Sequence, residues 1–231
     1  CRRIVNGLKE LHIDMAQVEG IFISHEHSDH IAGLQQLLKR FDIPVYTKQG
    51  TWREIQDKLI VPKNQLIELT KGSLTLGNLI VEPFAVSHDA ADPIGINVFA
   101  GKDIATVVTD TGVISDSILR RMDDTTLLVL EANYDPHMLR FGPYQPFLKQ
   151  RVASDEGHLS NEMAAQALLM MNRPDFMQVI LAHRSENNNN AVLVTQTIGK
   201  MLVDGGVRIG PEMKLQHGQP NEIVSMKSVK R

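Results

Sequence analysis

The sequence predicts a single domain of mixed α and β layers, and three observations carry this prediction. Short apolar runs typical of buried strands alternate with segments whose apolar residues recur at helical spacing. Glycines separate the short strands predicted in the middle of the chain. The 231 residues, 42% of them hydrophobic, contain no internal repeat and no linker rich in Pro or Gly, so we expect one domain over residues 1–231.

The first part of the chain is predicted to open on a helix, because Ile4, Leu8 and Leu11 fall on one helical face. A buried strand follows over 18–24, and the helix after it covers 31–40, with early Gly33. A strand at 44–47 and a helix around 52–59 complete this part.

From residue 65 the pattern changes to short strands, with Gly101-Lys102-Asp103 as a hairpin turn. Helices and strands then alternate again, and the polar tail after about residue 211 is expected to be loosely ordered. The predicted strands cover 65–69, 73–76, 79–86, 95–100, 104–109, 126–131 and 178–182, and the predicted helices cover 115–122, 136–139, 145–152, 161–171 and 192–203.

Charge and composition exclude several classes. The formal net charge of −3 gives no general sign of a nucleic-acid or membrane partner, although a local basic groove is compatible with it. No apolar run approaches the roughly 18 residues of a membrane span, and the N-terminus lacks the apolar stretch of a secretory signal. Cys1 is the only cysteine, so no intramolecular disulfide can form, which favours the reducing cytoplasm.

A metal site is predicted directly after the first buried strand, at His25-Glu26-His27-Ser28-Asp29-His30. Imidazole nitrogens and carboxylate oxygens are ligands that Zn²⁺, Mn²⁺ and Fe²⁺ favour. His25 and His27 point the same way if the segment is extended, whereas Glu26 and Ser28 fall on the opposite alternation and are not counted as ligands. The alternative is a polar loop with chance histidines.

Further candidate ligands follow later strands. His88 comes after the strand at 79–86, Asp110 after the strand at 104–109, and His183 after the strand at 178–182. His158 precedes the helix at 161–171. Because polar residues at strand ends gather at one edge of an α/β domain, we expect these side chains to build one site. Each histidine alone could instead be a surface or capping residue.

The pattern His25-x-His27-x-Asp29-His30, followed in order by His88, Asp110 and His183, resembles the metallo-β-lactamase fold superfamily. The resemblance implies an αββα sandwich with two divalent metal ions at the edge of the sheets. His25, His27 and His88 would hold one ion, Asp29, His30 and His183 the other, and Asp110 would bridge them. The superfamily begins with a β-hairpin that nothing here supplies, so we predict that residues 1–231 lack the first strands of the fold.

His158 lies between Asp110 and His183, where RNase-Z-like members carry a histidine that contacts the scissile phosphate. We therefore assign His158 as general acid and Glu131 as the carboxylate partner that holds its proton, with Asp29 as a further catalytic candidate. The alternative for His158 is a polar residue at a helix start, where Ser160 or Asn161 caps the helix.

Several stretches are similar to the YycJ/WalJ/VicX-type metal-dependent exonucleases, with Arg184 as a departure where an apolar residue is expected. The resemblance implies 5′→3′ exonuclease activity on DNA and a role in DNA repair. The similar stretches are 24–30, Val86-Ser87-His88-Asp89-Ala90 with Asp92-Pro93-Ile94-Gly95, Thr109-Asp110-Thr111-Gly112, Leu130-Glu131-Ala132-Asn133-Tyr134-Asp135, Gly157-His158-Leu159-Ser160-Asn161 and Leu181-Ala182-His183 before the Asn run.

We expect hydrolysis of a phosphodiester by a hydroxide that bridges the two ions. DNA is preferred to RNA as the substrate, and the sequence leaves the oligomeric state open. Arg140, Lys149 and Arg151, interleaved with Tyr134, Phe141 and Tyr144, could bind phosphates and stack on bases, or form a solvated face. The alternatives are a small-molecule hydrolase (thioester, lactone or cyclic phosphodiester), an RNA-processing nuclease, and a catalytically silent metal- or DNA-binding protein.

Overall fold

The computed structural model describes residues 1–70, 72–219 and 222–225. The chain forms two compact units. The first contains residues 1–77 and 90–94, and the second contains residues 78–89 and the chain from Gly95 onward. The prediction of a single domain over residues 1–231 stays a prediction, and each unit is described by itself.

The first unit is built on three parallel strands in the order β1-β2-β3. Its apolar core includes Ile23, Leu34, Val45, Trp52 and Ile55. These side chains hold helices against the sheet by removing apolar surface from water. The elements are α1 (Arg2–Glu10), β1 (Ile21–Phe22), α2 (Ser28–Ile31), α3 (Leu34–Leu38), β2 (Val45–Thr47), α4 (Gln49–Lys58), β3 (Leu66–Glu68) and β4 (Leu74–Leu76), with 3₁₀ turns at Met15–Gln17 and Lys63–Gln65.

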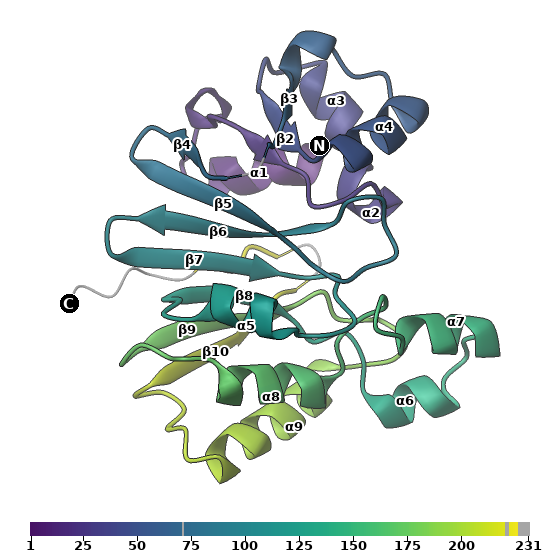
Figure 1. Cartoon of the computed structure of the whole chain (residues 1–231), viewed down its shortest axis with the longest axis vertical. Coiled ribbons are helices and arrows are strands. Elements are labelled where there is room, and N and C mark those ends of the chain that lie inside the picture. Colours follow the sequence, from purple (N-terminus) through teal and green to yellow (C-terminus); the bar gives the residue numbers. More distant parts are fainter. Residues whose placement is uncertain (71, 220–221, 226–231) are drawn as a thin grey trace. The chain divides into compact units, whose positions relative to one another are not determined.

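The second unit carries strands in the order β10-β9-β8-β7-β6-β5 (Figure 1). The pairs β7–β8, β8–β9 and β9–β10 are parallel, whereas β6 and β7 are antiparallel and joined at the predicted turn, where Gly101 has a φ of +63°. Glycine adopts this left-handed conformation without steric cost. The strands are β5 (Leu79–Ala85), β6 (Ile94–Ala100), β7 (Asp103–Val108), β8 (Leu127–Glu131), β9 (Met177–Ala182) and β10 (Met213–His217).

Helices α8 and α9 lie side by side along β8 to β10 in Figure 1. Leu128, Leu168 and Ile198 are fully buried in the core that they share with the sheet. Side-chain oxygens of Ser115, Asp135, Ser160 and Asn190 cap the N-termini of four helices of this unit. The helices are α5 (Asp116–Met122), α6 (Pro136–Phe141), α7 (Pro146–Val152), α8 (Asn161–Met170) and α9 (Ala191–Asp204).

Three predicted segments differ from the structure. The strand predicted at 18–24 is only Ile21–Phe22, and the helix predicted at 31–40 is divided into α2 and α3 near Gly33. The tail prediction is wrong for Met213–His217, which form β10, because this segment pairs in parallel with β9 and buries Met213 completely. Residues 220, 221 and 226–231 of that tail lie outside the described residues.

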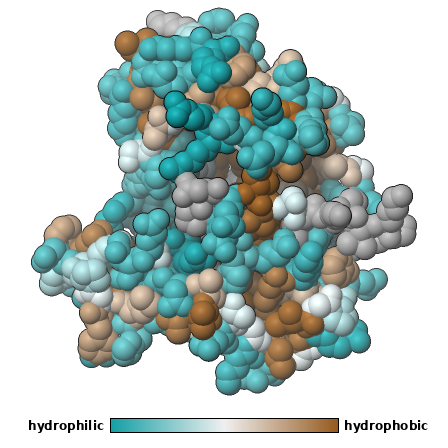
Figure 2. Space-filling view, turned by 180° about the vertical axis from the view of Figure 1, so that it is seen from behind, coloured by the Kyte–Doolittle hydropathy of each residue, from teal (hydrophilic) through white to brown (hydrophobic). Residues whose placement is uncertain are grey.

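On the face shown in Figure 2, hydrophilic residues predominate and apolar residues form separate patches. Among the described residues, no helix is both long and apolar enough to cross a membrane.

Candidate metal centre

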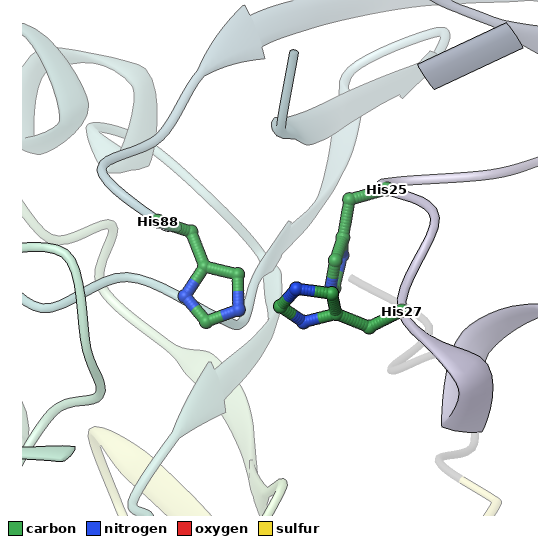
Figure 3. Close-up of side chains that lie close together, drawn as sticks. All are labelled: His25, His27 and His88. Carbon is green, nitrogen blue, oxygen red and sulfur yellow. The ribbon is translucent and has the colours of Figure 1, made fainter. Parts of the chain in front are cut away.

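The histidines of the first unit gather on the loop after β1. The ring of His25 is fully buried, and its centroid lies 4.5 Å from that of His27 and 4.1 Å from that of His30. Figure 3 shows His25 and His27 projecting from this one loop, and His88 on a separate loop. Ser24 Oγ lies 3.1 Å from Nδ1 of His25 and 3.2 Å from Nδ1 of His30, so Nε2 is the ring atom that each turns away from Ser24.

The other residues of this loop have distinct positions. Glu26 is buried, and its Oε1 accepts a hydrogen bond from the backbone N–H of Ala91 at 2.9 Å. It therefore braces the loop. Asp29 lies in the first turn of α2, where its side chain is 65% exposed and its Oδ2 is 3.6 Å from Nε2 of His30.

The second unit collects a separate cluster at the carboxyl ends of β7, β8 and β9. Asp110, Glu131, His158 and His183 each offer one ligand atom, and these atoms all lie within 4.8 Å of one another. Neighbouring parallel strands end at the same edge of a sheet, which explains why residues 73 positions apart in sequence meet.

The backbone at this edge is held in an unusual conformation. Asp110 and His183 have φ values of 56° and 51°, in the left-handed region that residues other than glycine seldom adopt. Such conformations cost roughly 1–3 kcal/mol each and cluster at functional sites. His183 follows β9 directly and Asp110 follows one residue after β7, so both conformations lie where the chain leaves the sheet.

Glu131 is the centre of the cluster. Its fully buried Oε1 lies 2.8 Å from Nδ1 of His158 and 2.7 Å from Nδ1 of His183, and its Oε2 accepts hydrogen bonds from the backbone N–H groups of Leu159 and Thr111. Burial by itself raises the pKa of Glu131, but hydrogen bonds and charge from the two histidines lower it below the ordinary value. An ionised Glu131 accepts a hydrogen bond from Nδ1–H of each ring. In each ring, Nε2 is then the nitrogen that does not contact Glu131.

His88 joins this cluster from the loop after β5. Its Nδ1 lies 3.1 Å from the carbonyl oxygen of Gly157, and its Nε2 lies 3.8 Å from Oδ1 of Asp110. Burial lowers the pKa of His88 below its ordinary value, against the opposing charge of Asp110, so the ring is neutral, as a metal ligand must be. A side chain at Gly157 would collide with the backbone of Arg151 and Val152, so glycine lets this loop approach.

Comparisons with known proteins show the family of the chain. Residues 5–183 match a family described as beta-lactamase superfamily domain. The chain is 34% identical over 214 residues to an exodeoxyribonuclease YycJ of Bacillus anthracis, covering 92% of this chain and 81% of that protein. It is 31% identical over 225 residues to an exodeoxyribonuclease WalJ of Streptococcus pneumoniae, covering 95% of this chain and 83% of that protein.

The fold has solved counterparts. The metallo-β-lactamase fold protein YhfI of Bacillus subtilis superposes with a TM-score of 0.65 at 16% identity, covering 90% of this chain and 79% of that one. The chain belongs to the metallo-β-lactamase superfamily. The predicted α/β class and the predicted family are therefore confirmed, and the chain is a metal-dependent hydrolase.

The residues of this metallo-β-lactamase superfamily member fit divalent ions. Two buried carboxylates, Asp110 and Glu131, face the rings of His88, His158 and His183 within the second unit. Buried negative charges need positive partners, and imidazole with carboxylate is a donor set that Zn²⁺ and Mn²⁺ accept. Within the first unit, His25, His27 and His30 carry imidazoles on one loop.

Contacts within the second unit bear on two of the alternatives left open by the sequence. Ser160, whose Oγ accepts from the N–H of Met163, caps α8, as the alternative reading of His158 expects, and the catalytic role of His158 stays a prediction. Arg151 pairs with Asp89, and Lys149 donates to the carbonyl of Arg140, so two of the three candidate phosphate-binding cations already have partners.

Sequence reasoning missed a buried pair of amides. Asn189 donates from Nδ2 to the carbonyl oxygens of Ala132 and Asn133, and exchanges hydrogen bonds with the side chain of Asn161. Asn133 in turn donates to the carbonyl of His183 at 2.8 Å. These amides tie together the segments after β8, before α8 and after β9. The signal was available, because four consecutive asparagines at 187–190 follow a strand-end histidine.

Proposed function

We propose that this superfamily member is a two-metal phosphodiesterase, and specifically a 5′→3′ DNA exonuclease. One observation carries the phosphodiesterase assignment: Glu131 fixes His158 by its Nδ1 atom inside the cluster of the second unit. The names of the YycJ and WalJ relatives, both exodeoxyribonucleases, support DNA as the substrate and an exonucleolytic action.

In the proposed ligand set, His25, His27 and His88 would hold one ion, Asp29, His30 and His183 would hold the other, and Asp110 would bridge them. Zn²⁺ and Mn²⁺ both suit these donors, and Fe²⁺ is an alternative. The orientation of the rings supports this set within each unit. His88 and His183 both direct Nδ1 to an oxygen of the protein and keep Nε2 toward Asp110. Such a second contact fixes the tautomer that a ligand needs.

The ions, when bound, would lower the pKa of a water molecule and neutralise charge on the phosphate. The chain's own residues do the remaining work. His158 donates a proton from Nε2 to the departing oxygen, and Glu131 keeps the ring in the orientation that this requires. Glu131 also holds His183, so one carboxylate positions both an acid and a ligand.

The cellular role belongs to the same proposal. A single cysteine is compatible with the cytoplasm, and an exonuclease acting on DNA ends there would serve DNA repair. If Arg140, Lys149 and Arg151 also contact the DNA backbone, its binding should weaken steeply as salt is added.

The test uses the purified chain with Zn²⁺ or Mn²⁺ and DNA labelled at its 5′ end. We expect release of the label as mononucleotide at the earliest times, with little cutting of an RNA of the same sequence. The panel includes bis-p-nitrophenyl phosphate, a thioester, a lactone and a cyclic phosphodiester. Faster turnover of the thioester or lactone than of DNA would overturn the proposal in favour of a small-molecule hydrolase.

A further inference from the structure

A cavity of about 380 Å³ opens beside His158 and His183 within the second unit. Part of the lining comes from the α6–α7 region, with Tyr144 and Leu148, and another part comes from the segment after β9, with Arg184 and Asn187. In Figure 1, α6 and α7 lie at the end of this unit. The cavity therefore adjoins the residue to which we assign proton donation.

Arg184 brings an uncompensated cation to this cavity. Arg184 lines the cavity, and within the described part of the chain no carboxylate forms an ion pair with it. A guanidinium without a carboxylate partner favours an anion, and phosphate matches its planar fork.

The second arginine of the cavity differs in this respect. Arg151 is bound by both carboxylate oxygens of Asp89 and its side chain is 48% exposed. Its charge is largely compensated within the protein. Arg184 is thus the cation left to recognise a ligand in the cavity.

The part of the lining that contains Tyr144 and Leu148 suits a nucleobase. Tyr144 and Leu148 pack against the buried cluster of Tyr134, Leu139 and Val152, which supports them from behind. The hydroxyl of Tyr144 also lies 3.4 Å from Nδ2 of Asn187. Aromatic side chains stack on any base, and the amide of Asn187 offers a donor and an acceptor at its edge.

The volume of the cavity limits the size of the ligand that it can hold. Ligand cavities range from roughly 300 to 1,000 Å³, and this one lies near the lower limit, so it has room for one nucleotide rather than two. We propose that this cavity binds one terminal nucleotide as its monophosphate, with Arg184 on the phosphate and Tyr144 against the base. The inference rests on the proposed function and deepens it, because a one-nucleotide site next to His158 places cleavage one unit from a chain end.

The test measures binding without turnover. Isothermal titration calorimetry of the metal-loaded protein uses three ligands: a deoxynucleoside 5′-monophosphate, the matching deoxynucleoside and inorganic phosphate. We expect the monophosphate to bind more tightly than either part alone. Equal affinity for the nucleoside would overturn the role of phosphate, and equal affinity for inorganic phosphate would overturn the base site.

Variants assign the effect to Arg184. Arg184→Leu should weaken monophosphate binding roughly 10- to 100-fold, as expected for loss of hydrogen bonds to a charged group. Arg184→Lys should give an intermediate value, since it keeps the charge and loses the fork. The matched control is Arg208→Leu at an exposed arginine that pairs with Glu212 on the surface. Wild-type affinity in Arg184→Leu, or an equal loss in Arg208→Leu, would contradict the inference.

The two proposals fail separately. A protein that binds the monophosphate through Arg184 but does not degrade DNA would refute the exonuclease and keep the cavity. An active exonuclease whose monophosphate affinity ignores both Arg184 variants would refute the cavity alone. A thermal melt by circular dichroism checks that Arg184→Leu is folded, and Arg184→Lys keeps the test decisive if it is not.

Discussion

His158 places its Nδ1 atom 2.8 Å from Oε1 of Glu131, a carboxylate with no exposed surface. The same Glu131 side chain accepts from the backbone N–H of the residue after His158. Two contacts from one buried group therefore fix both the ring and the peptide that carries it. If His158 donates the proton and is not a metal ligand, as we propose, its function should be separable from metal binding.

Replacing His158 by alanine should keep the metal content and lower kcat about 10²- to 10⁴-fold, the range for loss of a general acid. Elemental analysis and steady-state kinetics on DNA measure the two quantities. The matched control is His137→Ala, on the exposed side of α6, which should behave as wild type. An active His158→Ala protein would sink the assignment.

Replacing Asp110 by asparagine should lower metal content and activity together, because the substitution removes the buried charge that faces His88 and His183. Metal is counted after dialysis, and activity is measured on the same samples. Asp103→Asn, in the exposed β6–β7 turn, is the matched control. Full metal occupancy with no activity would argue against Asp110 as a ligand.

His217 predicts a pH dependence of stability. Burial, and then the charge of Arg184, lower its pKa below 6.5 in the folded chain. The unfolded chain then binds more protons as the pH falls below 6.5, so the free energy of unfolding decreases from there down through the folded pKa. Urea unfolding between pH 7.5 and 5 measures this slope. His217→Gln should flatten it, and an unchanged slope would exclude His217 as its origin.

Removing the buried amide in Asn189→Ala should destabilise the protein by roughly 1–3 kcal/mol. The carbonyl of Ala132 loses a side-chain donor, and the carbonyl of Asn133 keeps the N–H of Ser185. Metal affinity should fall as well, because Ala132 and Asn133 directly follow Glu131 in the chain. Chemical unfolding and a metal titration report the two effects. Asn64→Ala, at an exposed position, serves for comparison. Lower stability with unchanged metal affinity would limit Asn189 to a structural role.

Much of the fold followed from the sequence because local signals agreed with it. Strands such as β5, β8 and β9 were predicted within one or two residues, since each is a short apolar run with turn residues at its ends. β10 was missed because it is short. Met213 and Leu215 alternate with Lys214 and Gln216 over five residues only, within a polar segment. Only the pairing with β9 makes that segment a strand.

The candidate site was predicted in part for the same reason. His88, Asp110 and His183 stand at strand ends, a position visible in the sequence, and Glu131 could be named as the partner of His158. That Glu131 also holds His183 depends on the spacing of β8 and β9, which no local pattern encodes. The Asn161–Asn189 pair is likewise a long-range contact.

The left-handed backbone at Asp110 implies a trade-off between stability and function. Glycine suits a φ of 56° better than aspartate, and Asp110→Gly would also remove a carboxylate buried near Glu131. In chelator, this variant should therefore melt at a higher temperature than wild type while being inactive. Adding metal should make the wild type melt at the higher temperature, because metal binding stabilises only the protein that keeps the Asp110 carboxylate. Selection for stability alone would thus favour replacement of Asp110. Only selection for the reaction would keep aspartate at this position.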